Sequence, residues 1–455
     1  MSANGRGTAA GTDNPKTGAG TGAGTGGGAE PGAEPRVALL EALGRELPAA
    51  AALRRELHAL PRVSGQEEPT LKRVLDALPE GAVEQVAGTG AVLRIGGAGP
   101  AVGMRGELDA LPIAEQTGVP WASVNGAMHA CGHDVHLAAV VALARAVAAT
   151  GARDSHAADV HARDADALAP LLVVLQPREE TFPSGALDVV ASGVLGRHRV
   201  QAMIGAHVQP VLAGGTIACA PGPVNASADE FRVTVRGAEG HAAYPHLTRD
   251  PVLAMAQVIV AAQQLVSRVA DPMVPTVVTF GTVNAGSTPN AVPGEAVARG
   301  TLRTMSRKWR ERLHERFAQV VEDTARAYGC VAEVEILPGE PILVNDRALA
   351  VRAGERLREQ GWTVDDELRS CGADDFARYG EVAPSLMMFV GVDTAAGLHS
   401  PGFLPDDDAV GAVAEALLAG YLAASPPSTG GPSPDLGEMV SSGGRSGRVV
   451  RPYEG

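Results

Sequence analysis

The spacing of apolar side chains divides the first half of the chain into alternating helices and strands. Leucines recur at helical spacing from residue 36 to 60 and predict a helix, interrupted around Pro48 and ended by Pro61. Short apolar runs predict the strands that follow. The expected helices are 70–78, 136–149 and 185–194, and the expected strands are 91–95, 101–105, 171–175 and 202–207. This alternation, with polar residues at strand ends, predicts an α/β fold with a site at the edge of its sheet.

A second unit begins near residue 225 with its own order of elements. The pattern predicts a strand at 230–235, a helix at 250–269, strands at 277–284 and 296–304, a helix at 307–328 and a strand at 331–336. This order is the split βαβ pattern of ferredoxin-like domains. The first unit resumes with a helix at 348–360, a strand at 385–390 and a last helix at 407–424. We therefore expect a larger domain at 35–224 and 340–424, interrupted by an inserted domain at 225–339.

Three segments lack this patterning. Residues 1–34 and 425–455 are rich in glycine, alanine, serine, threonine and proline without a period, so we expect both tails to be disordered. Residues 151–169 are rich in Ala, Asp, His and Arg and predict a surface insertion, in which His156 and His161 are solvated loop residues.

Composition narrows the class of partner and compartment. A chain of 455 residues, 45% of them hydrophobic, is long enough for two domains with large cores. The formal net charge of −14 argues against nucleic acid or an anionic membrane as a partner. Four cysteines in so long a chain predict no disulfide framework, so we expect a reducing compartment, the cytoplasm. We identify no apolar run of about 20 residues and expect no membrane span.

The densest group of metal-binding side chains lies between Met128 and His136, in the run Met-His-Ala-Cys-Gly-His-Asp-Val-His. Cys131 and His133 are two apart, a spacing that points both side chains to one side in a strand end or turn. Thiolate and imidazole both suit Zn²⁺. Asp134 is placed to hold a ligating His in one tautomer. Taken alone, the stretch fits a structural zinc knot, or a satisfied buried His beside an inert Cys, as well as it fits a catalytic site.

More ligand-type side chains stand at predicted strand ends or in turns: Glu179 and Glu180, His207, and His399. Because strand ends of an α/β sheet converge, we expect these groups to meet the Cys131 stretch. Adjacent glutamates point apart in an extended segment, so one can ligate a metal while the other faces its water. A metal lowers the pKa of bound water toward ~7, and a carboxylate base carries the proton to the leaving amine. A solvated loop is the alternative for the Glu pair.

His241 lies in a turn of the inserted unit, beside glycine and proline residues. It can reach a substrate only if that domain folds over the larger one, or if it comes from a partner subunit. An imidazole there could stabilise the oxyanion of a tetrahedral intermediate. The alternative is an ordinary turn histidine, and Asn290 and Arg303 are likewise unremarkable by themselves.

The motifs, taken in order, resemble those of the M20 metallopeptidase family, in the amidohydrolase branch of N-acyl-amino-acid, hippurate and auxin-conjugate hydrolases. Several motifs in order are far more specific than one. The matching stretches are Arg54 to His58, Asp109 to Pro112, Met128 to His136, Gln176-Pro177 with Glu179-Glu180, Gly237 to His246, Asn290, and Leu398 to Pro401.

The resemblance implies a zinc-peptidase-like α/β catalytic domain with an inserted lid or dimerisation domain, and a homodimer formed through that domain. It implies two divalent metal ions (Zn, Mn or Co), with Glu179 as the general base. It implies that His241, in cis or in trans, binds the substrate carboxylate or the oxyanion, and we assign Asn290 and Arg303 to substrate binding. The implied metal ligands are Cys131, His133, Glu180, His207 and His399.

The chain departs from the family pattern near the site without losing an implied ligand. Arg178 replaces an alanine, and residues 181–184 (Thr-Phe-Pro-Ser) replace a glycine run, so the acyl pocket differs. Asp374 stands where the Ser-Glu-Asp-Phe motif has Glu, and Glu107 stands where the family has Asp.

These features predict a metal-dependent amidohydrolase that cleaves the amide of an N-acyl amino acid or small conjugate, using metal-activated water and a glutamate base. One alternative is a dipeptidase or carboxypeptidase of the same fold. Another is a metal-binding relative with low turnover that serves as a scaffold. Cys131, where peptidase branches carry another ligand type, favours the amidohydrolase, and the intact Glu179 argues against the scaffold.

Overall fold

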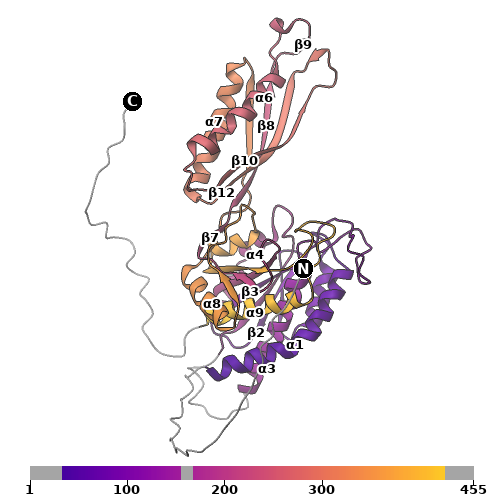
Figure 1. Ribbon diagram of the computed structural model, residues 1–455, viewed down its shortest axis with the longest axis vertical. Helices are drawn as coiled ribbons and strands as arrows, with labels where there is room; N and C mark the ends of the chain where they lie inside the picture. Colours follow the sequence, from indigo (N-terminus) through magenta and orange to yellow (C-terminus); the bar gives the residue numbers. More distant parts are fainter. Residues whose placement is uncertain (1–32, 155–167, 426–455) are drawn as a thin grey trace, which may run out of the picture.

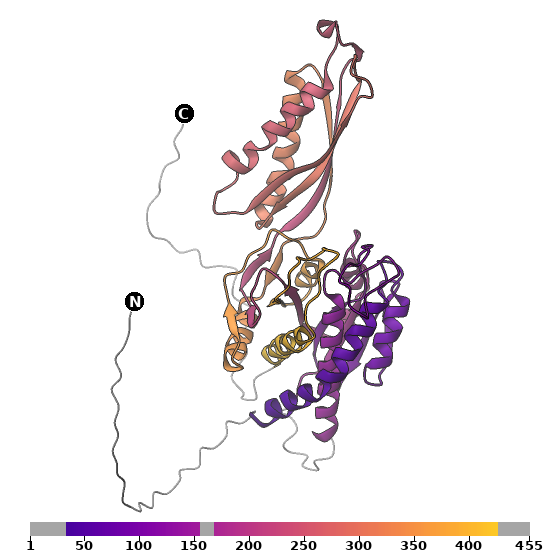
Figure 2. The ribbon, with the colours of Figure 1, turned by 45° about the vertical axis from the view of Figure 1, so that its right-hand side comes forward.

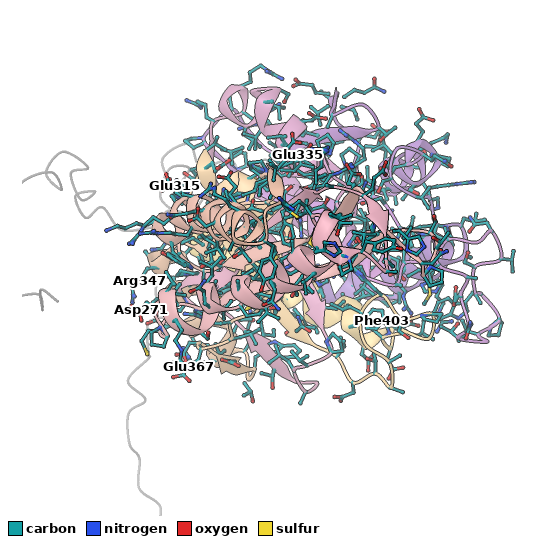
Figure 3. All side chains as sticks on the ribbon, turned by 90° about the horizontal axis from the view of Figure 1, so that it is seen from above. Asp271, Glu315, Glu335, Arg347, Glu367 and Phe403 are labelled. Atoms are coloured by element: carbon teal, nitrogen blue, oxygen red, sulfur yellow. The ribbon has the colours of Figure 1, made fainter. Side chains whose placement is uncertain are left out.

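The computed structural model describes residues 33–154 and 168–425. Nearly all of the two tails that we expected to be disordered lies outside these residues; only 33, 34 and 425 are described. His156 and His161 of the expected insertion also lie outside them. Two domains lie one above the other along the long axis (Figures 1 and 2). Viewed down that axis, charged side chains such as Glu315 and Glu367 lie around the outside (Figure 3).

The larger domain is built on an eight-stranded sheet in the order β1-β2-β4-β3-β5-β16-β6-β15. The four central strands, β4, β3, β5 and β16, run parallel to one another, so their carboxyl ends meet at one edge. The strands are β1 (Val83–Val86), β2 (Gly90–Ile95), β3 (Ala101–Glu107), β4 (Leu171–Gln176), β5 (Val200–Gln209), β6 (Thr216–Ala218), β15 (Thr363–Asp365) and β16 (Ser385–Gly391).

Helices cover both faces of this sheet. Along β4, Leu171 and Val173 enter one core while Leu172 and Val174 enter the other, which explains why the strand is apolar at every position before Gln176. The first core holds α1 (Ala33–Ala59), α2 (Glu68–Ala77), α3 (His133–Asp154), α8 (Arg347–Glu359) and α9 (Asp408–Ala424), and the second holds α4 (Gly185–Ala191), α5 (Val194–Arg197) and η3 (Asp375–Glu381).

The inserted domain has the split βαβ order predicted from the sequence. Its antiparallel sheet, β10-β12-β8-β13, packs one face on two helices around Phe231 and Phe317. The elements are β8 (Ser227–Arg236), α6 (Pro251–Ala262), β10 (Thr276–Ala285), β12 (Glu295–Thr304), α7 (Arg307–Ala327) and β13 (Val331–Leu337). Two short pairs complete the described chain: β7 (Gly222–Asn225) with β14 (Leu343–Asn345), and β9 (Gly240–His241) with β11 (Ala291–Val292). The α/β class is therefore confirmed, and the separate four-stranded sheet agrees with the expected inserted unit.

Three expected element boundaries were wrong. Helix α1 runs unbroken through Pro48, because Leu39 and Leu43 before it and Leu53 after it are all buried in the same core. The helix expected at 185–194 breaks at Gly193, which adopts a left-handed backbone (φ 72°). The helix expected at 250–269 ends at Ala262, and a π-helical turn, Leu265–Val269, follows.

The expectation that no apolar run reaches about 20 residues was also too strict. Two stretches of 19 residues, His133–Gly151 and Pro251–Val269, are long and apolar enough to cross a membrane by length and composition. The first window is 78% buried, as befits the central helix of a folded core. The second is 28% buried and carries exposed apolar side chains, including Val252, Leu253 and Val260.

Candidate metal and active site

The candidate site lies where the carboxyl ends of the central parallel strands meet. Glu179 and Glu180 follow β4, His207 lies near the end of β5, and His399 follows β16. Cys131 precedes α3 in a turn whose Gly132 has φ +86°, and His133 is the first residue of that helix. Because neighbouring parallel strands end together, these side chains meet although they lie far apart in sequence.

The other four expected ligands converge on the thiol of Cys131. Its Sγ lies 3.3 Å from Nε2 of His207 and 3.4 Å from Nε2 of His399. Oε1 of Glu180 lies 3.6 Å from Nε2 of His399 and 3.9 Å from Nε2 of His133. One atom each from Cys131, His133 and Glu180 forms a group with mutual distances within 4.8 Å. The sequence-predicted ligand set is therefore brought together.

Hydrogen bonds to the backbone fix two imidazoles in the orientation that a metal requires. Nδ1 of His133 donates to the carbonyl of Asp109 at 2.8 Å, and Nδ1 of His207 donates to the carbonyl of Val208 at 2.7 Å. Since a carbonyl only accepts, each Nδ1 carries the proton and each Nε2 presents a lone pair to the cluster. Among the described residues, the buried Nε2 of His133 and Oε1 of Glu180 have no hydrogen-bond partner. Thiol, imidazole and carboxylate are a donor set suited to a divalent transition-metal ion.

The side chain of Asp109 holds the Glu pair in place. Its two carboxylate oxygens accept from the backbone N–H groups of Glu179 at 3.1 Å and Glu180 at 3.0 Å, and Ser64 donates to it at 2.7 Å. Oε2 of Glu179 lies 3.7 Å from Nε2 of His133. Glu179 is therefore fixed beside the ligand cluster without belonging to the group formed by Cys131, His133 and Glu180.

Burial and like charges shift the proton affinities of the site. Burial, then Glu180 and Asp374, raise the pKa of Glu179 well above its ordinary value. Burial, then the two neighbouring glutamates, raise the pKa of the Cys131 thiol. Burial, then His136, lower the pKa of His207 to about 3. The cluster thus combines the neutral imidazole of His207 with two acids, Cys131 and Glu179, that resist ionisation. Crowding of negative charge has this effect, and a bound cation would offset it.

Asp134 does not hold a ligating histidine, contrary to expectation. Its carboxylate accepts from Nε of Arg54 at 2.8 Å and from Nδ1 of His58 at 2.9 Å, and all three side chains are buried. The Asp109 carbonyl performs the expected task for His133 instead. His129, the first imidazole of the stretch, is buried with neither ring nitrogen paired among the described residues.

Glu107 and His136 were not predicted as site residues from the sequence, yet they lie next to the expected ligands His133 and His207. They form a second group of potential ligand atoms with His133 and His207, within 4.8 Å of one another. Nε2 of His136 accepts from the backbone N–H of Val208 at 3.0 Å, so its Nδ1 carries the proton and donates to Glu107 at 3.2 Å. His136 is therefore already satisfied and supports the neighbouring groups.

The three expected substrate-binding residues lie away from the ligands. His241 is exposed on β9, at the end of the inserted domain farthest from the larger domain (Figure 1). The carbonyl of Asn290 accepts a hydrogen bond from the backbone N–H of Ala242, the residue after His241, so Asn290 lies in the same region as His241. Arg303 lies at the other end of that domain and donates to the carbonyl of Cys371 at 3.1 Å. Within one chain, the structure does not bring His241 or Asn290 to the cluster.

The two departures beside the Glu pair differ in their surroundings. The guanidinium of Arg178 is engaged by Asp188 and by the carbonyl of Pro183 at 3.3 Å. Phe182 is 56% exposed.

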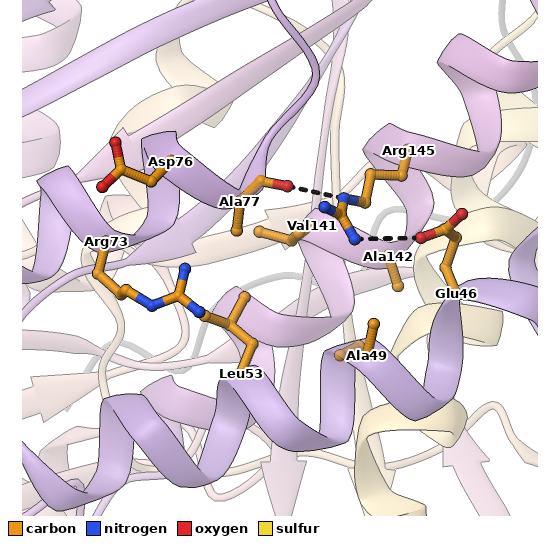
Figure 4. Close-up of a pocket in the computed structure, with 10 residues that line it drawn as sticks. Glu46, Ala49, Leu53, Arg73, Asp76, Ala77, Val141, Ala142 and Arg145 are labelled. Carbon is orange, nitrogen blue, oxygen red and sulfur yellow. Dashed lines mark hydrogen bonds and ion pairs between the residues drawn. The ribbon is translucent and has the colours of Figure 1, made fainter.

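A cavity of about 320 Å³ lies between α1, α2 and α3, away from the cluster (Figure 4). Its lining mixes apolar and charged side chains, and one of these, Arg145, donates to the carbonyl of Ala77 at 2.7 Å and to Glu46 at 3.3 Å. None of the metal-binding candidates lines it.

Comparison with known proteins places this chain in a family. The model described as "Peptidase family M20/M25/M40" matches residues 103–420. N-acetylcysteine deacetylase from Bacillus subtilis is 34% identical over 365 residues, which cover 79% of this chain and 92% of that protein. N-acetyldiaminopimelate deacetylase from Exiguobacterium sibiricum is 33% identical, over 79% of this chain and 95% of its own. A solved structure of a dinuclear metal-binding peptidase of family M20 from Bacillus subtilis superposes with a TM-score of 0.69 at 31% identity, over 83% of this chain and 98% of that one.

Proposed function

We propose that this chain, which belongs to the peptidase family M20/M25/M40, is a metal-dependent amidohydrolase that cleaves the amide bond of N-acyl amino acids. The observation that carries the proposal is the convergence of Cys131, His133 and Glu180 within 4.8 Å, with Glu179 fixed beside them. Two similar relatives are named as deacetylases of N-acetylated amino acids, which supports the same class of substrate.

The donor set supports a pair of divalent ions as the cofactor. Cys131, His133, Glu180, His207 and His399 are the residues that would hold them. When bound, such ions supply Lewis acidity, which polarises the substrate carbonyl and lowers the pKa of water. The choice among Zn, Mn and Co is open to direct measurement, and the similarity to a dinuclear metal-binding peptidase supports a count of two.

Glu179 has the position and the proton affinity of a general base. Its burial among carboxylates favours uptake of a proton. It would accept the proton of the attacking water as the water oxygen bonds to the carbonyl carbon. It would then deliver that proton to the leaving nitrogen as the C–N bond breaks, so that the products are a carboxylate and a free amine.

We further propose a homodimer in which His241 and Asn290 act on the partner's site. In a single chain both residues lie at the far end of the inserted domain (Figure 1). The exposed apolar side chains Val252, Leu253 and Val260 on α6, together with β10 at the edge of its sheet, support pairing through this domain. His241 would then stabilise the oxyanion or bind the substrate carboxylate.

Mixing two inactive variants tests this dimer. Glu179→Gln and His241→Ala chains, unfolded together and refolded, should regain about a quarter of wild-type activity, because half of the dimers contain one intact site of two. Each variant refolded alone is the control. No recovery in the mixture would contradict action in trans.

A substrate panel tests the reaction itself. N-acetyl, N-benzoyl and indoleacetyl amino acids should be hydrolysed in preference to dipeptides, and preference for dipeptides would instead identify a peptidase. Glu179→Gln should reduce turnover by about 10²- to 10⁴-fold while metal content stays unchanged. A fully active variant would contradict the assignment of the base.

We also propose a cytoplasmic location, which the four free thiols support.

A further inference from the structure

A single buried cation joins the two sides of the candidate site. Arg105, near the end of β3, is 2% exposed. Its guanidinium donates to Glu107 at 2.7 Å, to both carboxylate oxygens of Asp374 at 2.7 and 3.1 Å, and to Asp375 at 3.1 Å. These three carboxylates are themselves buried, and the Arg105 guanidinium contacts all of them.

The carboxylates that Arg105 holds lie against different parts of the catalytic machinery. Glu107 belongs to the group of ligand atoms that includes His133 and His207. Asp374 and Asp375 form another group with Glu179, again with atoms within 4.8 Å of one another. Arg105 therefore touches neither the implied ligands nor the base, but it contacts the neighbours of both.

The far side of this group is also held firmly. Asp375 accepts from Nε2 of Gln176 at 2.7 Å, and the amide oxygen of Gln176 accepts from the hydroxyl of Tyr379 at 2.8 Å. The ring of Phe376 lies 5.2 Å from the Arg105 guanidinium. Nε of Arg105 and Oε2 of Glu107 have no hydrogen-bond partner among the described residues, but the group is held on enough sides to have little freedom to accommodate a change in side-chain length.

We propose that Arg105 is a positioning residue that sets the separation between Glu179 and the metal-ligand side, and that the lengths of Glu107 and Asp374 are matched across it. The resemblance to the M20 family implies Asp at position 107 and Glu at position 374, whereas this chain has Glu and Asp. One methylene is gained on one side of the guanidinium and one is lost on the other. The two departures form one compensated exchange. The part of this inference that concerns kcat rests on the proposed function.

Restoring the family residues one at a time should separate the two sides of the site. Glu107→Asp withdraws one carboxylate by about 1.5 Å, and Asp374→Glu advances the other by the same length. Each single variant should lose a charge-assisted contact and lower kcat about tenfold or more. KM should change less than about twofold, because the proposal gives both residues a role in positioning and none in substrate binding. The double variant should return to within about threefold of wild-type kcat, since the total length is restored.

The readouts are kcat and KM at saturating metal, affinity for Zn²⁺ or Mn²⁺ by competition with a chelator, and urea unfolding of the metal-free protein. Asp229→Glu is the matched control, because it lengthens a buried carboxylate paired with Arg310 in the inserted domain. This control should change the free energy of urea unfolding without changing kcat. All three substitutions keep the charge, so no buried ion is left unpaired.

Additive losses in the double variant, or a rescue confined to unfolding with none in kcat, would overturn the positioning role. If wild type hydrolyses no substrate of the panel, the proposed function fails, and metal affinity then decides this inference. Weaker binding in each single variant with recovery in the double would support it. Weaker binding without recovery, or unchanged binding in both singles, would overturn it.

Discussion

Substituting Gly132 with alanine should damage the site more than the size of a methyl group suggests. Gly132 separates Cys131 from His133 and has φ +86°, where a Cβ would lie 2.4 Å from Cγ2 of the buried Val208. A left-handed backbone costs an L-residue roughly 1–2 kcal/mol. Forcing a methyl group into a filled core costs about 1–3 kcal/mol more. The total of about 2–5 kcal/mol is a large part of the stability of a typical domain, about 5–15 kcal/mol.

Gly126→Ala isolates the backbone part of this cost. Gly126 has φ +84°, and nothing within 4 Å would meet its Cβ. Urea unfolding of both metal-free variants should place Gly132→Ala lower by about 1–3 kcal/mol, which is the steric difference. Metal affinity should fall about tenfold or more in Gly132→Ala alone, because relief of the clash moves both adjacent ligands. Equal stabilities, or unchanged metal affinity in Gly132→Ala, would refute this reasoning.

Three further outcomes follow from the described contacts. Removing metal with a chelator should lower the melting temperature, and adding Zn²⁺ or Mn²⁺ should restore it, since the ion binds only the folded site. Scanning calorimetry measures this temperature, and an unchanged value would contradict a metal site. Burial lowers the pKa of His58, but Asp134 and Glu115 outweigh it and hold that pKa above 6.5. The stabilisation by protonated His58 is complete below that value and is lost as pH rises through the folded-state pKa. The gap in unfolding free energy between wild type and His58→Gln should therefore narrow as pH rises above 6.5, and a widening gap would contradict it. Gly300→Ala would place a Cβ 1.9 Å from the carbonyl of Thr279, so the inserted domain should become protease-sensitive while metal affinity stays unchanged; equal resistance to protease would contradict this.

The sequence predicted the long elements well because their signals are local. A helix such as α7 carries its own apolar stripe, with Leu313, Phe317 and Val321 all buried on one face. Strands of three or four residues, such as β6 and β15, are too short for a period to be read. Pro48 misled for the opposite reason: long-range packing of α1 outweighed a strong local signal.

The implied ligands were accessible from the sequence because chemically distinctive residues stood at strand ends. The residues that orient them were not, since their role is set by contacts between distant segments. The hold on His133 comes from the carbonyl of Asp109, a backbone group that no side-chain motif reveals. Arg105 pairs with Asp374 across 269 positions, and only the folded sheet shows that they meet. One signal was available: Glu107 and Asp374 were both noted as departures, but nothing local joined them.

The most direct test of the metal site is a crystal of the protein grown with Zn²⁺ or Mn²⁺ and measured at the absorption edge of that metal. Anomalous peaks should lie within bonding distance of Cys131 Sγ, His133 Nε2 and a carboxylate oxygen of Glu180, with Glu179 beside them. A well-ordered crystal of protein saturated with metal, whose anomalous density lies elsewhere or is absent from this cluster, would contradict the proposed centre.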